Sequence, residues 1–202
     1  MKTKFRKIYK KLNLRELNDI IFILRTENKS SILAKLSKKN IVKYLHEAVK
    51  TKDLELFIVI QKNIIGYAIL ACNPEYLVKN FEKFKKDFFI DLFLNLNFLV
   101  LFNIAISKLN FDKILISGKN KKVISESLNL NLLAIKKKYQ SRGLGKKFLK
   151  YIFKSSIHRS KYITCETDNE RSNNFYKKKL NFKSIGKRIR FLKLQTILAK
   201  KL

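Results

Sequence analysis

Apolar residues recur at helical spacing in some segments of the chain and form strand-like runs in others. In the first part of the chain this pattern predicts a strand over Phe5–Leu12, helices over Leu14–Arg25 and Ile41–Val49, and a hairpin of strands Leu54–Ile60 and Ile64–Cys72. Asn13 precedes the first helix and is expected to cap it. Gly66 interrupts the last strand, which indicates a bulge, the close approach of another backbone, or simply a tolerated weak position in the strand.

The second part of the chain alternates strands and helices and ends in two strands. The predicted elements are a central strand Leu128–Ile135, a helix Gly143–Phe153, a strand Tyr162–Glu166, a helix Arg171–Lys179, and strands around Phe182–Ile185 and Ile189–Leu198 that turn at Gly186-Lys187. This order is typical of an α/β domain with a mixed sheet, and 202 residues fit one domain.

The chain has only five glycines, and two of them, Gly143 and Gly145, lie one residue apart where the central strand is expected to lead into a helix. Glycine lets a ligand approach the backbone, and the free N–H groups of a first helical turn form an anion site. Arg142, Lys146 and Lys147 add positive charge there. The pattern therefore indicates a phosphate-binding loop, although two glycines and a solvated lysine face would also make an ordinary turn.

The residues from Ala134 to Gly145 closely resemble the acyl-CoA pyrophosphate loop of the GCN5-related N-acetyltransferases (GNAT), Q/R-x-x-G-x-G/A after a strand. Lys137 replaces a frequent proline, and Ser141 replaces a frequent glycine. A second block, Ile163–Asn169 followed by Asn174–Phe182, looks like the family's next strand, helix and strand. Asn181 stands there in place of the usual glycine, which is tolerable because asparagine is next best in a left-handed cap.

The resemblance implies an α/β fold with one GNAT-like domain over residues 1–202, in which helices flank a mixed, mostly antiparallel central sheet. It also implies that the central strand and the next strand splay apart to admit the pantetheine arm. Residues 74–127 exceed the simplest family plan and are expected to form a largely helical insertion before the central strand.

The resemblance further implies acetyl-CoA as co-substrate. Backbone groups of the loop would hold its pyrophosphate, and the residues concerned are Gln140, Ser141, Arg142, Gly143, Leu144, Gly145 and Lys146. Ala134 and Ile135 would hold the pantetheine and thioester by resemblance alone. Asn169 matches a position that hydrogen-bonds the pantetheine region, and it would equally serve as a helix N-cap.

The catalytic roles are less constrained. Tyr176 matches the family's general acid for the leaving thiolate, and the alternative is a core aromatic beside Phe175. The general base stays open among Glu126, Glu166 and a water chain, since each carboxylate would also suit a surface ion pair. Tyr44, His46 and Glu47 fall on the family's acceptor side by resemblance, although an ordinary amphipathic helix is favoured as their explanation.

The insertion contains an amphipathic segment, Tyr76–Lys86, and an almost continuously apolar one, Phe88–Ile106. The second approaches the length of a membrane span, but one crossing would separate strands that must share a sheet. Buried packing is therefore favoured, and an in-plane membrane helix, a homodimer interface and an acceptor-pocket helix stay open. Lys108–Ser125 is expected to be a loop with a short apolar piece.

The chain carries 46 basic and 15 acidic residues, a formal net charge of +31. Because the lysines are spread evenly, a composition bias is favoured over a dedicated nucleic-acid face, and no specific nucleic-acid partner is expected. Cys72 and Cys165 lie in apolar strand-like runs and lack metal-ligand spacing, so we expect buried free thiols and no metal. No secretory signal is evident, and a cytoplasmic protein is predicted.

Together these features predict an N-acetyltransferase that transfers acetyl directly from acetyl-CoA to a primary amine in a ternary complex. An amino-sugar nucleotide is one candidate acceptor, and a protein amine or an antibiotic-like amine stays open. The alternative is a noncatalytic basic protein on the same fold that binds nucleic acid or a membrane surface.

Overall fold

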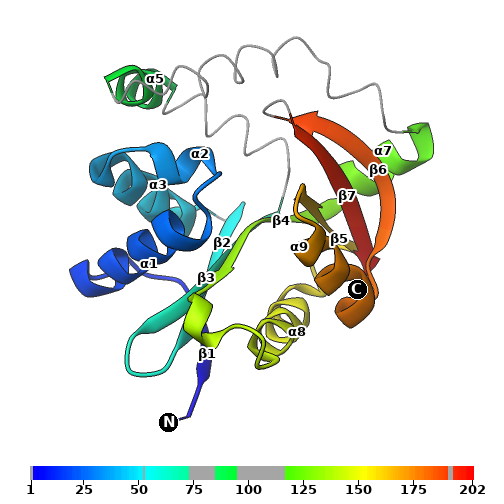
Figure 1. The fold of residues 1–202 in the computed structure, drawn as a ribbon, viewed down its shortest axis with the longest axis horizontal. Helices are drawn as coiled ribbons and strands as arrows, with labels where there is room; N and C mark the ends of the chain where they lie inside the picture. Colours follow the sequence, from blue (N-terminus) through cyan, green and yellow to red (C-terminus); the bar gives the residue numbers. More distant parts are fainter. Residues whose placement is uncertain (1, 52, 73–84, 95–116, 191–192) are drawn as a thin grey trace. The chain divides into compact units, whose positions relative to one another are not determined.

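Seven strands form one sheet in the computed structural model, which describes residues 2–51, 53–72, 85–94, 117–190 and 193–202. The strands are β1 (Lys4–Ile8), β2 (Leu54–Ile60), β3 (Ile64–Ala71), β4 (Ser127–Ile135), β5 (Tyr162–Thr167), β6 (Lys183–Arg190) and β7 (Lys193–Lys201). Their order is β1-β2-β3-β4-β5-β7-β6 (Figure 1). β4 and β5 are parallel, whereas β2 is antiparallel to both β1 and β3, and β7 to both β5 and β6, so the predicted mixed, mostly antiparallel sheet is confirmed.

The helices lie between these strands in the predicted order. They are α1 (Leu14–Glu27), α2 (Ile32–Lys35), α3 (Lys38–Lys50), α5 (Lys85–Leu94), α7 (Gly118–Ser125), α8 (Leu144–Ser156) and α9 (Glu170–Asn174), with a 3-10 turn at Lys137–Tyr139 and a π-helical turn at Phe175–Lys179. Asn13 caps α1 as predicted, in a capping box with Glu16. The short helix α2, capped by Ser31, was not predicted, because four residues are too few to show a period.

The chain divides into two units, the first formed by Met1–Cys72 and Leu130–Ser156. β2 and β3 are apolar and buried along nearly their whole length. α1 and α3 pack on these strands, and α8 lies on the opposite face (Figure 1). There Phe5 contacts Phe148 and Tyr151 of α8, and Phe57 contacts Tyr151. Cover on both faces explains why these strands read as continuous hydrophobic runs.

The second unit comprises Asn73–Asn129 and Ile157–Leu202. The β4–β5 ladder covers Ser127 to Asn129 of β4, where the buried hydroxyls of Ser127 and Thr164 lie 2.8 Å apart. The predicted turn at Gly186-Lys187 is wrong, because both residues lie inside β6. Gly186 instead adjoins a register shift between β6 and β7, a bulge that glycine also signals.

Most of the described residues between 74 and 127 lie in α5 and α7. The prediction of a loop over Lys108–Ser125 is wrong for α7, whose first turn is closed by hydrogen bonds from Asn120 N and Lys121 N to Ser117 O. The apolar segment Phe88–Ile106 lies partly in α5 and partly outside the described residues. Most of Tyr76–Lys86 and all of Ile114–Ile116 lie outside the described residues. No helix among the described residues is long and apolar enough to cross a membrane. The boundaries of the insertion stay a prediction.

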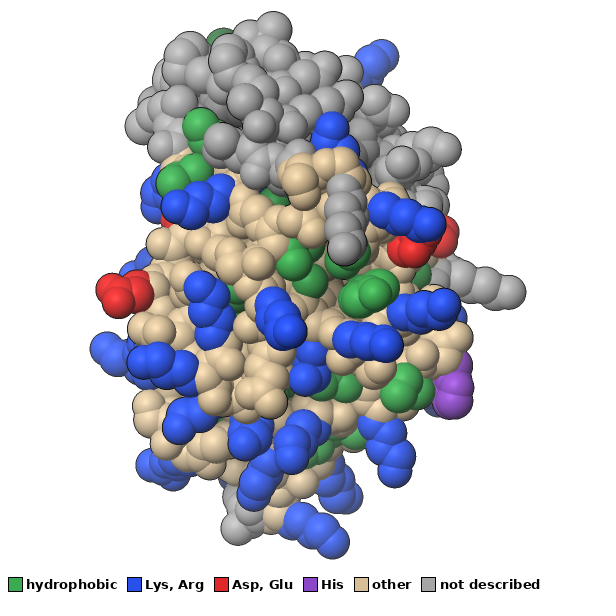
Figure 2. All heavy atoms as spheres, turned by 90° about the vertical axis from the view of Figure 1, so that its right-hand side faces the viewer, with side chains coloured by type: hydrophobic (Ala, Val, Ile, Leu, Met, Phe, Trp, Pro, Cys, Tyr) green, Lys and Arg blue, Asp and Glu red, His purple; other side chains and the backbone are tan. Residues whose placement is uncertain are grey.

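Positive charge dominates the visible surface. Figure 2 shows one face on which Lys and Arg side chains are numerous and spread, and Asp and Glu side chains are few. This agrees with the formal charge of +31 and its even distribution along the chain.

A charged pair is buried between β1, β2 and the end of α8 in the first unit. Lys7 forms an ion pair with Glu55, and the exposed fractions of the two side chains are 15% and 2%. Ser156 Oγ donates a hydrogen bond of 3.3 Å to the other carboxylate oxygen, and Lys7 Nζ lies 5.7 Å from the ring centre of Phe57. Removing one member would leave the other charge buried without compensation.

We expect Glu55→Ala to lower the free energy of unfolding by about 3–5 kcal/mol, measured by urea denaturation. The control is Lys122→Ala, which breaks the exposed Lys122–Glu126 pair and should cost less than about 0.5 kcal/mol. Equal small losses in both variants would contradict the buried-pair argument.

Candidate functional site

The segment Lys136–Gly143 carries the chain from the end of β4 to the start of α8, and all of it lies in the first unit. Tyr139 N and Gln140 N donate to Lys136 O and Lys137 O at 2.8 and 3.1 Å, closing the 3-10 turn. Ser141 and Gly143 then adopt left-handed backbones with φ of 61° and 71°. Ser141 thus takes the conformation for which glycine is the usual residue, at a cost of about 1–2 kcal/mol.

Helix α8 begins directly after this turn, and Gly143 O accepts the first helical hydrogen bond from Lys147 N at 3.1 Å. The N–H groups of Leu144, Gly145 and Lys146 precede any intrahelical acceptor and can bind an anion. Arg142, Lys146 and Lys147 are exposed beside them. The structure therefore brings the predicted pyrophosphate-loop residues, Gln140 to Lys146, together in a shape suited to phosphate, and their role stays a prediction.

Ala134 and Ile135 are buried at the end of β4, where β3 approaches closely. A Cβ added to Gly66 would lie 2.9 Å from both Ala134 O and Ile135 Cγ1. Lys136 N also donates to Ile65 O at 2.8 Å. The close backbone approach and the bulge predicted at Gly66 are thus confirmed, since the β2–β3 register also shifts next to it.

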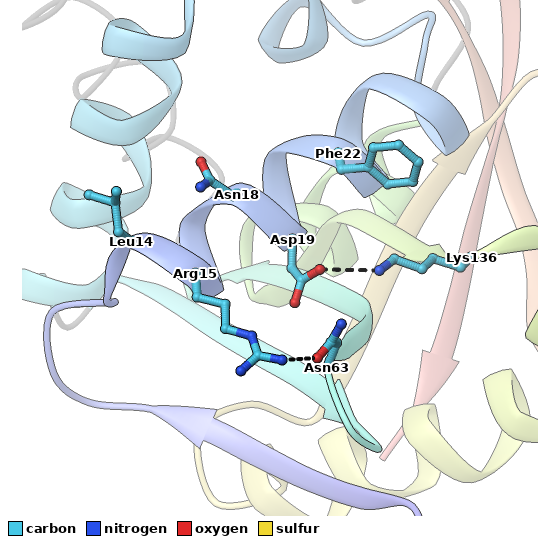
Figure 3. Close-up of a pocket in the computed structure, with 7 residues that line it drawn as sticks. All are labelled: Leu14, Arg15, Asn18, Asp19, Phe22, Asn63 and Lys136. Atoms are coloured by element: carbon cyan, nitrogen blue, oxygen red, sulfur yellow. Dashed lines mark hydrogen bonds and ion pairs between the residues drawn. The ribbon is translucent and has the colours of Figure 1, made fainter.

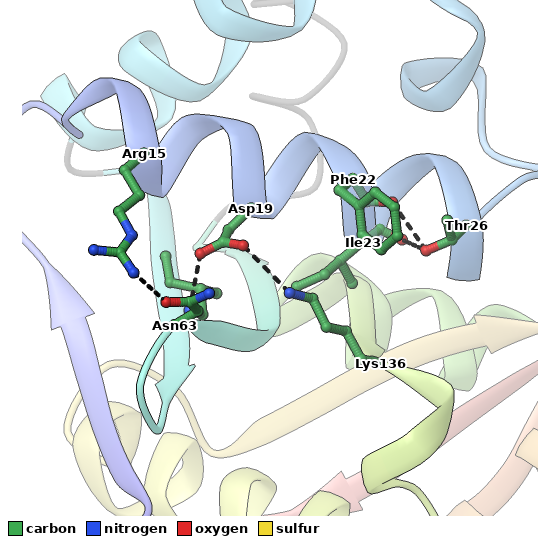
Figure 4. Close-up of polar contacts among 8 residues, drawn as sticks. Arg15, Asp19, Phe22, Ile23, Thr26, Asn63 and Lys136 are labelled. Carbon is green, nitrogen blue, oxygen red and sulfur yellow. Dashed lines mark hydrogen bonds and ion pairs between the residues drawn. The ribbon is translucent and has the colours of Figure 1, made fainter.

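Two carboxylates of α1 reach the same segment, and the sequence analysis did not identify them. Glu27 Oε1 accepts from Lys137 N at 2.9 Å, and Glu27 Oε2 accepts from Gln140 Nε2 at 3.2 Å. Asp19 accepts from Ile64 N at 3.1 Å and forms an ion pair with Lys136 Nζ at 3.2 Å (Figure 4). The available signal was two acidic residues eight positions apart on one helix in a strongly basic chain.

A pocket of about 670 Å³ opens beside this contact (Figure 3). Its lining residues are Leu14, Arg15, Asn18, Asp19, Phe22, Asn63 and Lys136. Two polar pairs lie in the pocket wall: Arg15 contacts Asn63, and Lys136 contacts Asp19 (Figure 3). A second pocket, of about 370 Å³, adjoins the loop and includes Tyr139, Arg142 and Lys147.

Tyr176, the predicted general acid, lies in the second unit within the π-helical turn. It is buried between the rings of Phe175 and Phe182, whose centres are 5.4 and 5.3 Å away. Burial, with a smaller effect of Cys165, raises the pKa of Tyr176 well above 10. The phenol therefore stays protonated and can donate a proton. Its packing against two rings also agrees with the alternative, a core aromatic. Asn181, φ 57°, has the left-handed backbone predicted for it.

The remaining predicted residues of the second unit make local contacts. Asn169 caps α9 by accepting from Ser172 N at 3.1 Å, so the N-cap reading is confirmed. Glu126 is exposed near Lys122, and Glu166 forms an ion pair of 2.8 Å with Arg188. Neither carboxylate is singled out as the base by these contacts. Its identity stays open.

Two polar side-chain pairs lie in the first unit, one between Tyr67 of β3 and Asn28, the residue after α1, and one between Tyr44 of α3 and Asn131 of β4. Tyr67 Oη donates to Asn28 Oδ1 at 2.8 Å, and burial raises the pKa of Tyr67. Burial also raises the pKa of Tyr44 to about 12, although a hydrogen bond with Asn131 acts against this. Desolvation lowers the pKa of His46, so this imidazole is neutral at pH 7. These groups are neutral hydrogen-bonding partners, and a role in acceptor binding stays a prediction.

Cys72 and Cys165 are free thiols as expected, and Cys165 is buried, but the predicted burial of Cys72 is wrong because it is only half-buried directly after the end of β3. Burial raises the pKa of Cys165, which makes it an unreactive thiol rather than a nucleophile. Within the described ranges, no three His, Cys, Asp or Glu side chains gather in a way that could hold a metal ion.

Comparison with known proteins agrees with this geometry. Residues 123–182 match the model of the acetyltransferase (GNAT) family. A GNAT-family protein of Desulfovibrio desulfuricans has a similar structure, with 11% identity, 99% of each chain covered and a TM-score of 0.60. So has a GNAT acetyltransferase of Elizabethkingia anophelis solved with acetyl-CoA bound, at 15% identity, 99% and 98% coverage and a TM-score of 0.54.

A mosquito arylalkylamine N-acetyltransferase-like protein shares 15% identity over 98% of this chain and 100% of its own, with a TM-score of 0.59. No curated protein matches the sequence. At these identities the likeness establishes the fold, and the predicted resemblance is confirmed by the family match.

We expect Gly143→Ala to lower the free energy of unfolding by about 1–2 kcal/mol, because its Cβ meets no neighbour but its left-handed backbone is strained. Gly143→Asn should recover most of this loss, since asparagine tolerates the left-handed region. Both variants are measured by urea denaturation.

The matched control is the same pair of substitutions at Gly66, where steric contact rather than φ is the constraint. There Asn should cost more than Ala, because it adds atoms against the β4 backbone. The same ranking at both glycines would contradict the distinction.

Proposed function

Since this chain carries a GNAT acetyltransferase segment at residues 123–182 and the fold of that family, we propose that it is an N-acetyltransferase that uses acetyl-CoA. It would transfer the acetyl group directly to a primary amine in a ternary complex. The observation that carries this proposal is the left-handed turn at Ser141 and Gly143, which opens α8 with free N–H groups.

The cofactor side has the strongest support. Pyrophosphate oxygens suit the N–H groups of the first turn of α8, and Arg142, Lys146 and Lys147 add charge attraction. Ala134 and Ile135 at the end of β4 would hold the pantetheine and the thioester. The similar Elizabethkingia protein binds acetyl-CoA, which supports the same ligand here.

Acetyl-CoA supplies the thioester, and the chain must position it and move two protons. The amine gives one proton to a base, for which Glu126, Glu166 and water are the candidates. The departing thiolate must receive a proton, and Tyr176 Oη is suited to supply it because its phenol stays neutral. Asn169 would add a contact to the pantetheine through the part of its amide that the cap leaves available.

For the acceptor we propose an anionic amine such as an amino-sugar nucleotide, supported by the +31 charge and by the basic face in Figure 2. The same charge supports the alternative, a noncatalytic protein that binds nucleic acid or a membrane surface. A cytoplasmic location, and a homodimer through the insertion, also stay proposals.

Saturating acetyl-CoA should raise the melting temperature of the protein by several degrees. Ligand at ~100 times its dissociation constant adds about 2.7 kcal/mol, and a domain of this size shifts by roughly 2–4 °C per kcal/mol. Gly143→Asp, checked for folding by circular dichroism, should show no shift, because it places a carboxylate at the anion site. No shift in the parent protein would favour the noncatalytic alternative, as would salt-sensitive nucleic-acid binding.

Tyr176→Phe should lower the rate of acetyl transfer about 100-fold or more while acetyl-CoA binding persists. Because the pKa of Tyr176 lies above 10, the parent rate should not fall through ionisation of this phenol as pH rises from 6 to 9.5. Rates are measured by thiol release against a panel of amines, with Tyr162→Phe as the control. Full activity of Tyr176→Phe would remove the proton-donor role.

A further inference from the structure

Asp19 and Glu27 project from one side of α1, because positions eight apart on a helix, with Ile23 between them, share a face. Both side chains contact the segment that follows β4, and Figure 4 shows Asp19 directed at Lys136. Helix α1 therefore touches the predicted phosphate loop at two points.

Glu27 spans the 3-10 turn from end to end. One carboxylate oxygen accepts from Lys137 N at the start of the turn, and the other accepts from Gln140 Nε2 at its end. Gln140 Nε2 also donates to Ile135 O at 2.7 Å. The carboxylate thus ties together the last residue of β4, the turn and the residue before left-handed Ser141.

Asp19 holds the base of the same segment. It accepts from Ile64 N of β3 and pairs with Lys136 Nζ, while Lys136 N donates to Ile65 O. The side chains of Asp19 and Lys136 are each only 18% exposed, so this ion pair is largely sheltered from solvent. Lys136 is consequently held against α1 and β3.

Because Glu27 is negatively charged, its effect on acetyl-CoA binding distinguishes two roles for this residue. A carboxylate beside a polyanion site repels the ligand, so a merely adjacent Glu27 would weaken acetyl-CoA binding. A carboxylate that aligns the loop N–H groups before the ligand arrives would strengthen binding, because less ordering remains to be done on association. The two roles predict opposite effects of removing the side chain.

We infer that Glu27 is a positioning residue that preorganises the phosphate loop through Lys137 N and Gln140. This inference rests on the proposed acetyl-CoA binding. Glu27 does not touch the ligand in this role. It acts by fixing the 3-10 turn that directly precedes Ser141, Gly143 and the start of α8.

The test compares the parent protein with Glu27→Ala and Glu27→Gln by calorimetric titration of acetyl-CoA. Deuterium exchange over residues 137–143 of the ligand-free proteins is measured in parallel. Asp53→Asn is the control, since it removes a negative charge from the same unit at the end of β2 away from the hairpin.

We expect Glu27→Ala to weaken acetyl-CoA binding about tenfold and to speed exchange in the loop. Glu27→Gln, which keeps one oxygen for Lys137 N, should lose less, and Asp53→Asn should stay within about twofold of the parent. Equal or tighter binding by Glu27→Ala, with unchanged exchange, would overturn the inference. A parent protein that binds no acetyl-CoA would instead refute the proposed function, and faster exchange in Glu27→Ala would then still support the positioning role.

Discussion

The candidate site depends on how the chain turns from the end of β4 into α8. A buried strand must end, reverse direction and open a helix whose first N–H groups point outward, and this needs left-handed backbone at Ser141 and Gly143. Contacts outside the turn hold this strained geometry. Lys136 N bonds to β3, and α1 reaches the turn through Glu27. The predicted anion site therefore depends on contacts from β3 and α1 as well as on the turn itself.

Carboxylates are few in this chain, and several of them form ion pairs with lysine or arginine. Glu55 forms an ion pair with Lys7, Asp19 with Lys136, and Glu166 with Arg188, and these side chains are buried or half-buried. In a chain of +31 charge each such pair relieves repulsion locally and fixes one basic side chain. Tyr176, by contrast, is neutral, because burial raises the pKa of its phenol. The phenol therefore keeps the proton that the proposed acyl transfer would use.

Local sequence predicted the features that depend on a few neighbouring residues. Asn13 caps α1, Asn181 adopts the left-handed backbone, and the glycines after β4 mark the strand-to-helix turn. Gly186 was predicted to lie in a turn, but it lies beside a bulge. Glycine is common in both, and only the pairing of β6 with β7 decides between them.

The sequence by itself thus predicted the order of the strands and of the longer helices apart from α7, and the strand-to-helix turn at Gly143, because these follow from short-range periodicity and backbone preference. Only the tertiary structure decided that Glu27 and Asp19 of α1 hold that loop, more than a hundred positions away along the chain. It also decided that Tyr176 is buried between two rings. The contacts of Glu27 and Asp19 depend on how α1 packs on the sheet, and no local pattern encodes contacts between residues so far apart in the sequence.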